Sequence, residues 1–310
     1  MADIATGPSR NASAERTIEF MSGGVAVRGW LRLPGGAGPH PLVILAHGLG
    51  GLKEWDIPAV ADALVGAGIA ALAFDYRNFG DSDGTPREEV DHCGQIEDFQ
   101  NAITFASTLS EIDAERIGLW GTSLGGRNVL AVAALDPRVK CVFAQVPGIA
   151  DMPLWLNFGA QLFSGGDVAK FHRDRAEDRQ GRAMGKEPRY AALDPDPSAE
   201  HYERNMAFGE VELRNYKSRL TLRSFEPTIA HEITHLMRLI APKPLRMVLT
   251  EGDVMFDAQM KAFDAALEPK SLIVLPGHHY ALYAQGKERD TTGLDKAVAA
   301  AREWFVEHLA

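Results

Sequence analysis

The chain has little cysteine, no long apolar run and no excess of positive charge, and each shortage narrows the classes of protein to consider. Its 310 residues include only Cys93 and Cys141, which provide no disulfide framework and fit a reducing compartment. No apolar stretch is long enough to span a bilayer, and residues 1–16 lack the apolar core of a signal peptide. The formal net charge of -10 argues against nucleic acid or an anionic membrane as a partner. We therefore expect a cytoplasmic protein that binds neither.

Short apolar runs alternate with helical patterns over most of the chain. Residues on both sides of Ser22-Gly23-Gly24 alternate between apolar and polar and predict a β-hairpin, whereas later apolar runs predict strands buried on both faces. The eight predicted strands are 17–21, 25–33, 42–46, 69–74, 117–120, 139–146, 245–250 and 271–275. Helices are predicted at 57–65, 88–109, 127–135, 256–267 and 295–308. This alternation favours an α/β fold with a mostly parallel eight-stranded sheet flanked by helices.

Residues 150–238 break this alternation. The stretch has few strand-like runs and many charges, but it also contains large apolar groups that need cover. We interpret it as a helical cap inserted after the sixth strand. The predicted organisation is a flexible N-terminal tail at 1–16, a core formed by 17–149 and 239–310, and the cap at 150–238.

A nucleophilic serine is predicted where the strand at 117–120 ends. Gly121-Thr122-Ser123-Leu124-Gly125 matches G-x-S-x-G between a strand and a helix, which is the context of a nucleophile elbow. The chain must reverse so sharply there that the serine backbone is strained, and small neighbours such as Gly121 and Gly125 let strand and helix approach. We expect Ser123 at the edge of the sheet, at the positive end of the following helix.

A serine hydroxyl becomes a good nucleophile when an imidazole takes its proton and a carboxylate orients that imidazole. Active residues of parallel sheets lie at the carboxyl ends of the strands, and the expected chain order is serine, acid, histidine. Asp253 follows the strand at 245–250, and we favour it as the acid over Glu251 and Asp257.

The histidine is predicted in the loop after the strand at 271–275, which reads Pro276-Gly277-His278-His279-Tyr280. His279 is favoured over His278, because the Pro-Gly turn needs one spacer residue before an imidazole can point inward.

Two backbone N–H groups are needed to bind the oxyanion that forms during acyl transfer. One is assigned to Leu124, the residue after the nucleophile. The other is assigned to Leu49 in the loop after the strand at 42–46, with Gly48 as the neighbouring alternative. His47 is expected to hydrogen-bond its own loop rather than to carry a proton.

Aromatic residues near these strand ends are candidates for substrate contact. Trp55 and Tyr76 follow strands close to the expected site. Trp155 and Phe158 of the cap suggest an apolar roof for an acyl or aromatic substrate. The alternative is that the cap aromatics only pack the cap onto the sheet.

A different chemistry is suggested by His231-Glu232-Ile233-Thr234-His235, which matches H-E-x-x-H. On a helix this spacing places two imidazoles on one face beside a glutamate, as in zinc metalloproteases. No third ligand follows at the usual spacing, and no nucleotide-binding motif is present, so we predict neither a metal nor a cofactor. A zinc hydrolase that uses His231 and His235 is the less favoured alternative.

Several segments together resemble bacterial and fungal α/β-hydrolases, nearest to the group described as dienelactone-hydrolase-like or polyketide-transferase-like. The segments that carry the resemblance are His47-Gly48, Asp75–Gly84, Gly121–Gly126, Ile240–Pro244, Glu268–Lys270 and Leu275–His279, with residues 215–224 in the cap. The resemblance implies the α/β-hydrolase fold with a cap. Members of this family carry Gly-Gly-His or Gly-Lys-Gly-His before an aromatic residue, which places His279 at the histidine position.

The resemblance also implies a reaction class, which is hydrolysis or transfer of an acyl group on an ester, thioester or lactone. Dienelactone hydrolases proper use a cysteine nucleophile, so Ser123 argues against that activity. We therefore predict a serine hydrolase that forms an acyl-enzyme on Ser123, with an acyltransferase using the same triad as the alternative. The expected substrate is a small acyl compound. The sequence does not determine the oligomeric state, and a homo-oligomer is compatible with it.

Overall fold

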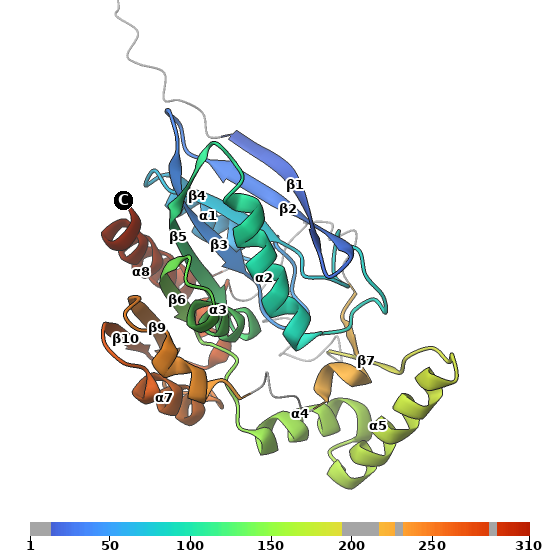
Figure 1. Ribbon diagram of the computed structural model, residues 1–310. Helices are drawn as coiled ribbons and strands as arrows, with labels where there is room; N and C mark the ends of the chain where they lie inside the picture. Colours follow the sequence, from blue (N-terminus) through green and yellow to red (C-terminus); the bar gives the residue numbers. More distant parts are fainter. Residues whose placement is uncertain (1–13, 194–216, 227–231, 285–289) are drawn as a thin grey trace, which may run out of the picture.

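An eight-stranded sheet runs through the centre of the protein (Figure 1). The computed structural model describes residues 14–193, 217–226, 232–284 and 290–310. The strands lie in the order β1-β2-β4-β3-β5-β6-β9-β10. Their bounds are β1 (Ala14–Ser22), β2 (Val25–Leu33), β3 (His40–Ala46), β4 (Ala70–Phe74), β5 (Ile112–Thr122), β6 (Val139–Gln145), β9 (Leu245–Thr250) and β10 (Lys270–Leu275).

Most neighbouring strands are parallel. Only β2 runs antiparallel to its neighbours, β1 on one side and β4 on the other. All pairs from β4 through β3, β5, β6 and β9 to β10 are parallel. The prediction of a mostly parallel eight-stranded sheet with an N-terminal hairpin is therefore confirmed. The carboxyl ends of β3, β5, β9 and β10 consequently lie along one edge of the sheet.

Helices cover both faces of the sheet (Figure 1). On one face lie α1 (Ile57–Val65) and α8 (Thr292–Leu309), and on the other lie α2 (His92–Ala106), α3 (Leu124–Leu135) and α7 (Phe256–Ala265). Strand β3 contributes Leu42 and Ile44 to one apolar cluster and Val43 and Leu45 to the other. Because strand residues alternate between faces, a strand covered on both sides needs a continuous apolar run, which is the pattern in the sequence.

Helix α2 begins later than predicted, and the cause is local backbone geometry. Glu88 has a positive φ of 54°, which a right-handed helix does not allow. The Asp91 carboxylate instead accepts the Gly94 N–H at 3.0 Å and caps the helix that starts at His92.

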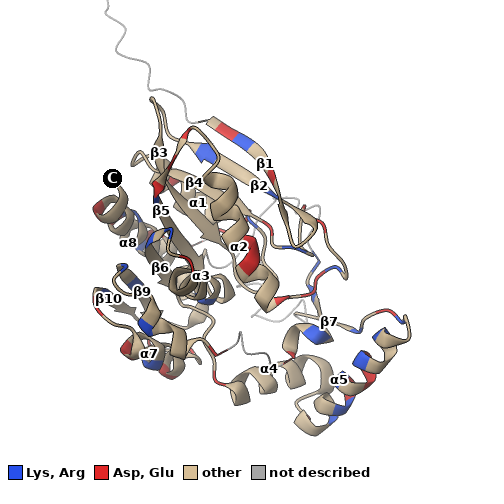
Figure 2. Cartoon of the chain, viewed as in Figure 1, with Lys and Arg blue, Asp and Glu red and all other residues tan. Residues whose placement is uncertain are grey.

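Between β6 and β9 the chain leaves the sheet. This inserted segment contains α4 (Met152–Ser164), α5 (Val168–Ala183), β7 (Tyr190–Ala192), β8 (Arg219–Thr221) and the 3-10 helix η1 (Leu222–Phe225), and η2 (Thr234–Leu239) precedes β9. Lysine, arginine and acidic residues follow one another along α5 (Figure 2). The inserted segment also has an aromatic interior, since Phe171 and Phe225 are fully buried.

Ion pairs join the inserted segment to the loop before α2. The Glu88 carboxylate accepts the Arg219 guanidinium at 2.8 Å, and the Glu89 carboxylate accepts Arg182 at 2.6 Å and Arg223 at 2.8 Å. Both glutamates are buried, so these pairs are shielded from solvent on the core side. Among the described residues, no helix has both the length and the hydropathy that crossing a membrane requires.

Candidate active site

Ser123 occupies the sharp turn between β5 and α3. Its backbone has φ 52° and ψ −124°, a conformation that L-residues adopt only at a cost of about 1–3 kcal/mol. Three backbone hydrogen bonds hold this conformation. The Ser123 N–H donates to Gln145 O at 3.0 Å, and the Ser123 carbonyl accepts the N–H groups of Gly148 at 2.6 Å and Arg127 at 3.1 Å.

Glycines let the strand, the helix and the neighbouring loop come this close. A Cβ atom on Gly121 would lie 2.4 Å from the Gly125 carbonyl oxygen, and one on Gly125 would lie 2.4 Å from the His47 carbonyl oxygen. A Cβ atom on Gly48 would lie 3.2 Å from the Ser123 Cβ atom. The loop after β3, the turn at Ser123 and the start of α3 are therefore packed backbone against backbone.

Three polar side chains from different strand ends meet at this turn. The His279 Nε2 atom lies 3.0 Å from the Ser123 Oγ atom, and the His279 Nδ1 atom lies 2.7 Å from Asp253 Oδ2. Because a carboxylate only accepts, Nδ1 carries the proton and donates it to Asp253, which leaves Nε2 free to accept the serine hydroxyl. This geometry is that of a nucleophile, a base and an orienting acid.

The neighbouring candidates lie elsewhere. The exposed His278 ring accepts the Tyr280 N–H at 3.2 Å, within its own loop. Glu251 and Asp257 are both exposed at the surface, whereas Asp253 is buried. The structure thus brings together the favoured acid and the favoured histidine with Ser123.

The Asp253 carboxylate is kept ionised by its hydrogen bonds. Burial alone would raise its pKa, but hydrogen bonds from His279, the Met255 N–H and the Gln259 amide outweigh burial, so the pKa of Asp253 lies below its usual value. The donors lie 2.9 Å away for Met255 and 3.0 Å for Gln259. A charged carboxylate here stabilises an imidazolium on His279.

Of the two amides assigned to the oxyanion hole, that of Leu124 follows Ser123 directly, and that of Leu49 follows Gly48, which packs against Ser123. Leu124 is the first residue of α3, and the N–H groups of a first helical turn have no intrahelical acceptor. Leu49 follows Gly48 in the loop after β3 and is partly buried against the core. His47 Nδ1–H donates to Gly48 O at 3.0 Å, and burial lowers the pKa of His47, so this ring is neutral and holds its own loop.

A buried lysine fixes the loop after β3 to the loop after β4. The Lys53 N–H donates to Asp75 Oδ1 at 2.9 Å, and the Lys53 ammonium donates to Asp75 Oδ2 at 2.6 Å and to Asp81 at 2.8 Å. Burial alone would lower the pKa of Lys53, but these carboxylates raise it overall. The Leu49 loop is therefore held at both ends, by its glycine contacts to the elbow and by this ion pair.

The four aromatic residues predicted to contact substrate fall into two groups, Tyr76 and Trp55 in the core and Trp155 and Phe158 in the inserted segment. Tyr76 is 1% exposed, and its hydroxyl accepts the Asn128 amide at 3.2 Å. The centre of its ring lies 4.5 Å from that of the His47 ring. Trp55 is partly buried in the loop before α1.

Trp155 and Phe158 both lie on α4 of the inserted segment. The Trp155 ring stacks on Phe225 at 5.1 Å and lies edge-on to His92 of α2 at 5.7 Å. Phe158 contacts Phe225 at 5.5 Å and is 40% exposed. These rings therefore connect the inserted segment to α2 and leave one aromatic face open to solvent.

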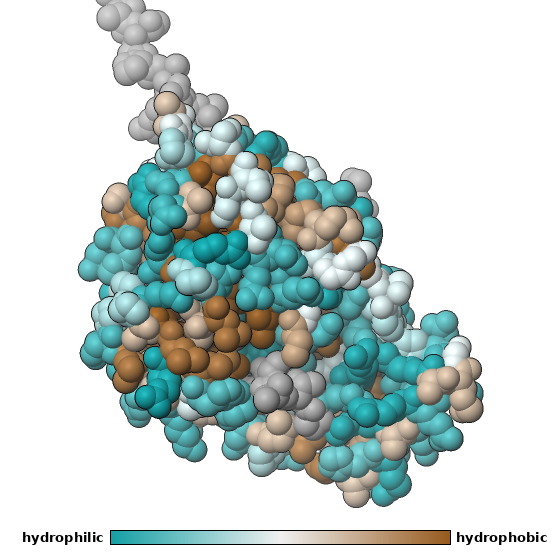
Figure 3. All heavy atoms as spheres, viewed as in Figure 1, coloured by the Kyte–Doolittle hydropathy of each residue, from teal (hydrophilic) through white to brown (hydrophobic). Residues whose placement is uncertain are grey.

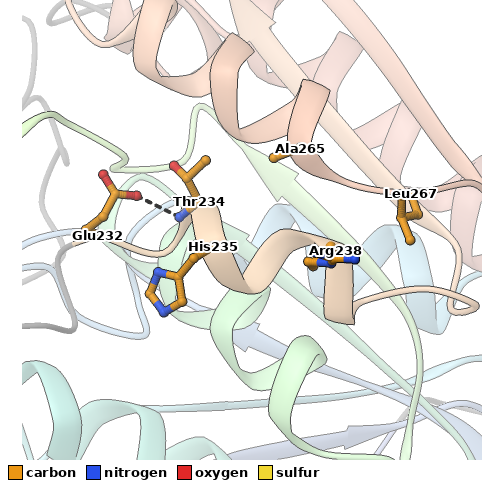
Figure 4. Close-up of a pocket in the computed structure, with 6 residues that line it drawn as sticks. All are labelled: Glu232, Thr234, His235, Arg238, Ala265 and Leu267. Atoms are coloured by element: carbon orange, nitrogen blue, oxygen red, sulfur yellow. Dashed lines mark hydrogen bonds between the residues drawn. The ribbon is translucent and has the colours of Figure 1, made fainter.

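The H-E-x-x-H segment does not form the α-helix that its metal-binding interpretation requires. His231 lies outside the described residues. Glu232 and Ile233 lie before the 3-10 helix η2, and His235 is exposed on η2. Glu232 and His235 instead line a shallow groove with Thr234, Arg238, Ala265 and Leu267, where Glu232 accepts the Thr234 N–H at 2.7 Å (Figure 4). In the described part of the chain, no three His, Cys, Asp or Glu side chains gather as metal ligands would.

The face around this groove is apolar. Figure 3 shows brown, hydrophobic residues over α3 and α7. Three leucines are exposed there: Leu135 ends α3, Leu239 ends η2 and Leu267 follows α7. Nothing in this groove joins the serine, histidine and aspartate, so the site at the sheet edge is separate from it.

A family model described as the α/β-hydrolase fold matches residues 41–284. The chain belongs to the α/β-hydrolase family. This match covers Ser123, Asp253 and His279 together, and it confirms the resemblance found in the sequence.

Curated relatives have related names. An acyltransferase, drtE, of Aspergillus calidoustus is 32% identical over 271 residues, which are 83% of this chain and 85% of that protein. A thiohydrolase of Eupenicillium brefeldianum is 29% identical over 284 residues, which are 87% of this chain and 88% of that one. The quorum-quenching protein AidA of Acinetobacter baumannii is 43% identical over 130 residues, and that match spans 42% of this chain and 43% of AidA.

Solved structures agree with the fold. The crystal structure of the α/β-hydrolase GrgF from a Penicillium species superposes with a TM-score of 0.77 at 25% identity, covering 96% of this chain and 99% of that one. The chain is an α/β-hydrolase enzyme, and its relatives include proteins named as thiohydrolases and one named as an acyltransferase.

Proposed function

We propose that this α/β-hydrolase cleaves a carboxylic ester or thioester through an acyl-enzyme on Ser123. The observation that carries the proposal is the continuous hydrogen-bonded chain from the Ser123 hydroxyl through His279 to Asp253, with contacts of 3.0 Å and 2.7 Å. A serine, a neutral imidazole and a buried carboxylate in this order are the parts that acyl transfer to serine requires.

The reaction would proceed in two halves. The Ser123 oxygen bonds to the acyl carbon while its proton passes to His279 Nε2, and the carbonyl electrons move to the oxygen facing the Leu124 and Leu49 amides. Collapse of this intermediate breaks the bond to the leaving group, which takes the proton from His279. Water then gives a proton to His279, attacks the acyl carbon and releases the acid, returning the proton to Ser123.

The aromatic residues of the inserted segment and the names of the relatives support a substrate class. We treat the inserted segment as a cap whose Trp155 and Phe158 face an acyl or aromatic group, with Trp55 as a further contact from the core. Apolar aromatic walls favour an acyl chain over a sugar. The relatives named as thiohydrolases support a thioester, in which the thiolate is a good leaving group.

Acyl transfer is the second candidate, and the relative named as an acyltransferase favours it. The acyl-enzyme on Ser123 is the same in both reactions, and only the molecule that takes the acyl group from Ser123 differs. The outcome depends on whether water or an alcohol or amine reaches the acyl-enzyme first. Adding graded concentrations of alcohols and amines to a turning-over reaction and measuring the products would separate the two.

The test uses esters and thioesters of graded acyl length together with a fluorophosphonate probe. Ser123→Ala should abolish labelling and lower kcat by about 10³-fold or more. His279→Ala should lower kcat similarly, whereas His278→Ala should retain wild-type turnover, and this neighbouring pair forms a matched control. Labelling that persists in Ser123→Ala, or an inactive His278→Ala enzyme beside an active His279→Ala enzyme, would overturn the assignment.

A further inference from the structure

A buried glutamine contacts the same oxygen of the candidate acid that the histidine contacts. Gln259 sits on α7 and is fully buried, at 0% exposed. Its amide nitrogen donates to Asp253 Oδ2 at 3.0 Å and to the Pro147 carbonyl at 2.9 Å. An amide nitrogen has two N–H donors, so both donors of Gln259 are used.

The hydrogen bond from Gln259 to the Pro147 carbonyl links the acid to the nucleophile. Pro147 follows β6, and the next residue, Gly148, donates its N–H to the Ser123 carbonyl at 2.6 Å. A Cβ atom on Gly148 would lie 2.9 Å from the Leu124 nitrogen, so this loop packs directly against the elbow. Gln259 therefore bridges the loop that carries Asp253 and the loop that supports Ser123.

The hydrogen bond from Gln259 to Asp253 determines how the charge of the carboxylate is shared among its donors. Oδ1 accepts the Met255 N–H at 2.9 Å, which fixes one edge of the carboxylate. Oδ2 is shared by the Gln259 amide and by His279 Nδ1 at 2.7 Å. Without the amide, His279 would be the only side chain bonded to Oδ2, and the Met255 N–H would be the only other donor that fixes the carboxylate.

We propose that Gln259 is a positioning residue that orients Asp253 and limits how strongly its carboxylate attracts a proton onto His279. The proposal rests on the proposed function, because it assigns a role within the same triad. The amide is suited to this task, because a glutamate at 259 would face Asp253 with a second negative charge and the Pro147 carbonyl with an acceptor. A neutral donor satisfies both groups without adding charge beside the imidazole.

The test compares Gln259→Met and Gln259→Glu with Gln95→Met. Methionine matches the volume of glutamine and removes both donors. Gln95 is another buried glutamine, 2% exposed, whose side-chain oxygen accepts the Asn128 amide at 3.1 Å. Each protein is assayed for kcat/KM on a chromogenic ester across pH 5–9, and the wild-type chain sets the reference.

The acid limb of the profile is the informative part, since the base must be unprotonated to act. Removing the amide leaves more of the Asp253 charge to His279, so the limb should move upward by about half a pH unit to one unit in Gln259→Met. It should move further in Gln259→Glu, and plateau kcat/KM should fall about tenfold in both. Gln95→Met should lower stability and leave the limb in place.

A readout without turnover keeps this proposal separate from the function. The pH midpoint at which the His279 ring resonances move by NMR should rise in Gln259→Met and stay at the wild-type value in Gln95→Met. An unchanged midpoint in a folded Gln259→Met protein would overturn the positioning role, whatever the substrate proves to be. A shifted midpoint together with an active Ser123→Ala enzyme would instead support the positioning role and refute the proposed nucleophile.

Discussion

The close approach at the serine turn can be tested by adding one methyl group, with Gly125→Ala. The new Cβ atom would lie 2.4 Å from the His47 carbonyl oxygen and 2.7 Å from that of Ala46, about 1 Å short of the 3.4 Å at which ordinary contact begins. Both obstacles are backbone atoms, so no side chain can rotate away. Relief must come from moving α3, and Ser123 with it, relative to the loop that carries Leu49.

Two opposing effects set the magnitude for Gly125→Ala. Alanine in a helix is favoured over glycine by about 1 kcal/mol, whereas overpacking a rigid contact costs about 1–3 kcal/mol. We expect a net loss of about 0–2 kcal/mol in the free energy of unfolding. A displacement of about 1 Å at reacting groups can cost about 100-fold in rate, so the activity loss should exceed what the stability loss explains.

The assay is urea unfolding together with kcat on a chromogenic ester, with Gly181→Ala as the matched control. Gly181 lies within α5, and a Cβ atom there would meet only Lys186 side-chain carbons, the nearest at 3.5 Å. The same substitution should therefore stabilise the protein by about 0.5–1 kcal/mol and leave kcat unchanged. A Gly125→Ala enzyme as stable and as fast as the wild type would refute the close-packing argument.

Two further predictions concern buried charges. Lys53→Met leaves the fully buried Asp75 carboxylate without its ammonium partner and should lower the free energy of unfolding in urea by about 3–5 kcal/mol. Lys140→Met removes a more exposed ion pair and should lower it by less than about 1 kcal/mol. Equal losses in the two variants would contradict the role of burial. Burial alone would raise the pKa of Asp174, but hydrogen bonds from Lys170, Ser164 and Arg189 lower it to about 2. A depressed pKa stabilises the fold above the unfolded value near 4, so the stability gap between wild type and Asp174→Asn should shrink as pH falls from about 4 towards 2. A gap independent of pH would refute this reasoning.

Much of the sheet was predictable because burial on both faces demands continuous apolar runs. The bounds of the α1 helix and of β9 and the presence of all eight strands could be inferred in this way. The start of α2 could not, since it depends on the positive φ of Glu88, which no residue pattern signals. Periodicity thus predicts which segments are elements, whereas local backbone geometry decides where each one begins.

The polar side chains of the site were predictable for a related reason. Topology fixes where strand ends lie, so a serine, an acid and a histidine at successive carboxyl ends could be expected to converge. The same logic does not place an aromatic ring, because position at a strand end does not determine which way the ring turns, and Tyr76 after β4 is buried against His47. Gln259 was missed altogether, since its role depends on Pro147, which lies 112 residues away along the chain.

The strain at Ser123 makes the serine substitution a clean experiment. The unusual φ and ψ are held by hydrogen bonds of the backbone, to Gln145 on one side and to Gly148 and Arg127 on the other. None of these bonds uses the hydroxyl, and the closest approach of a Cβ atom on Gly48 would be to the Ser123 Cβ atom, which alanine keeps. An alanine at 123 bears the same strain that the serine bears, so the turn should keep its shape. Lost turnover in Ser123→Ala would therefore reflect the missing oxygen nucleophile and not a relaxed elbow.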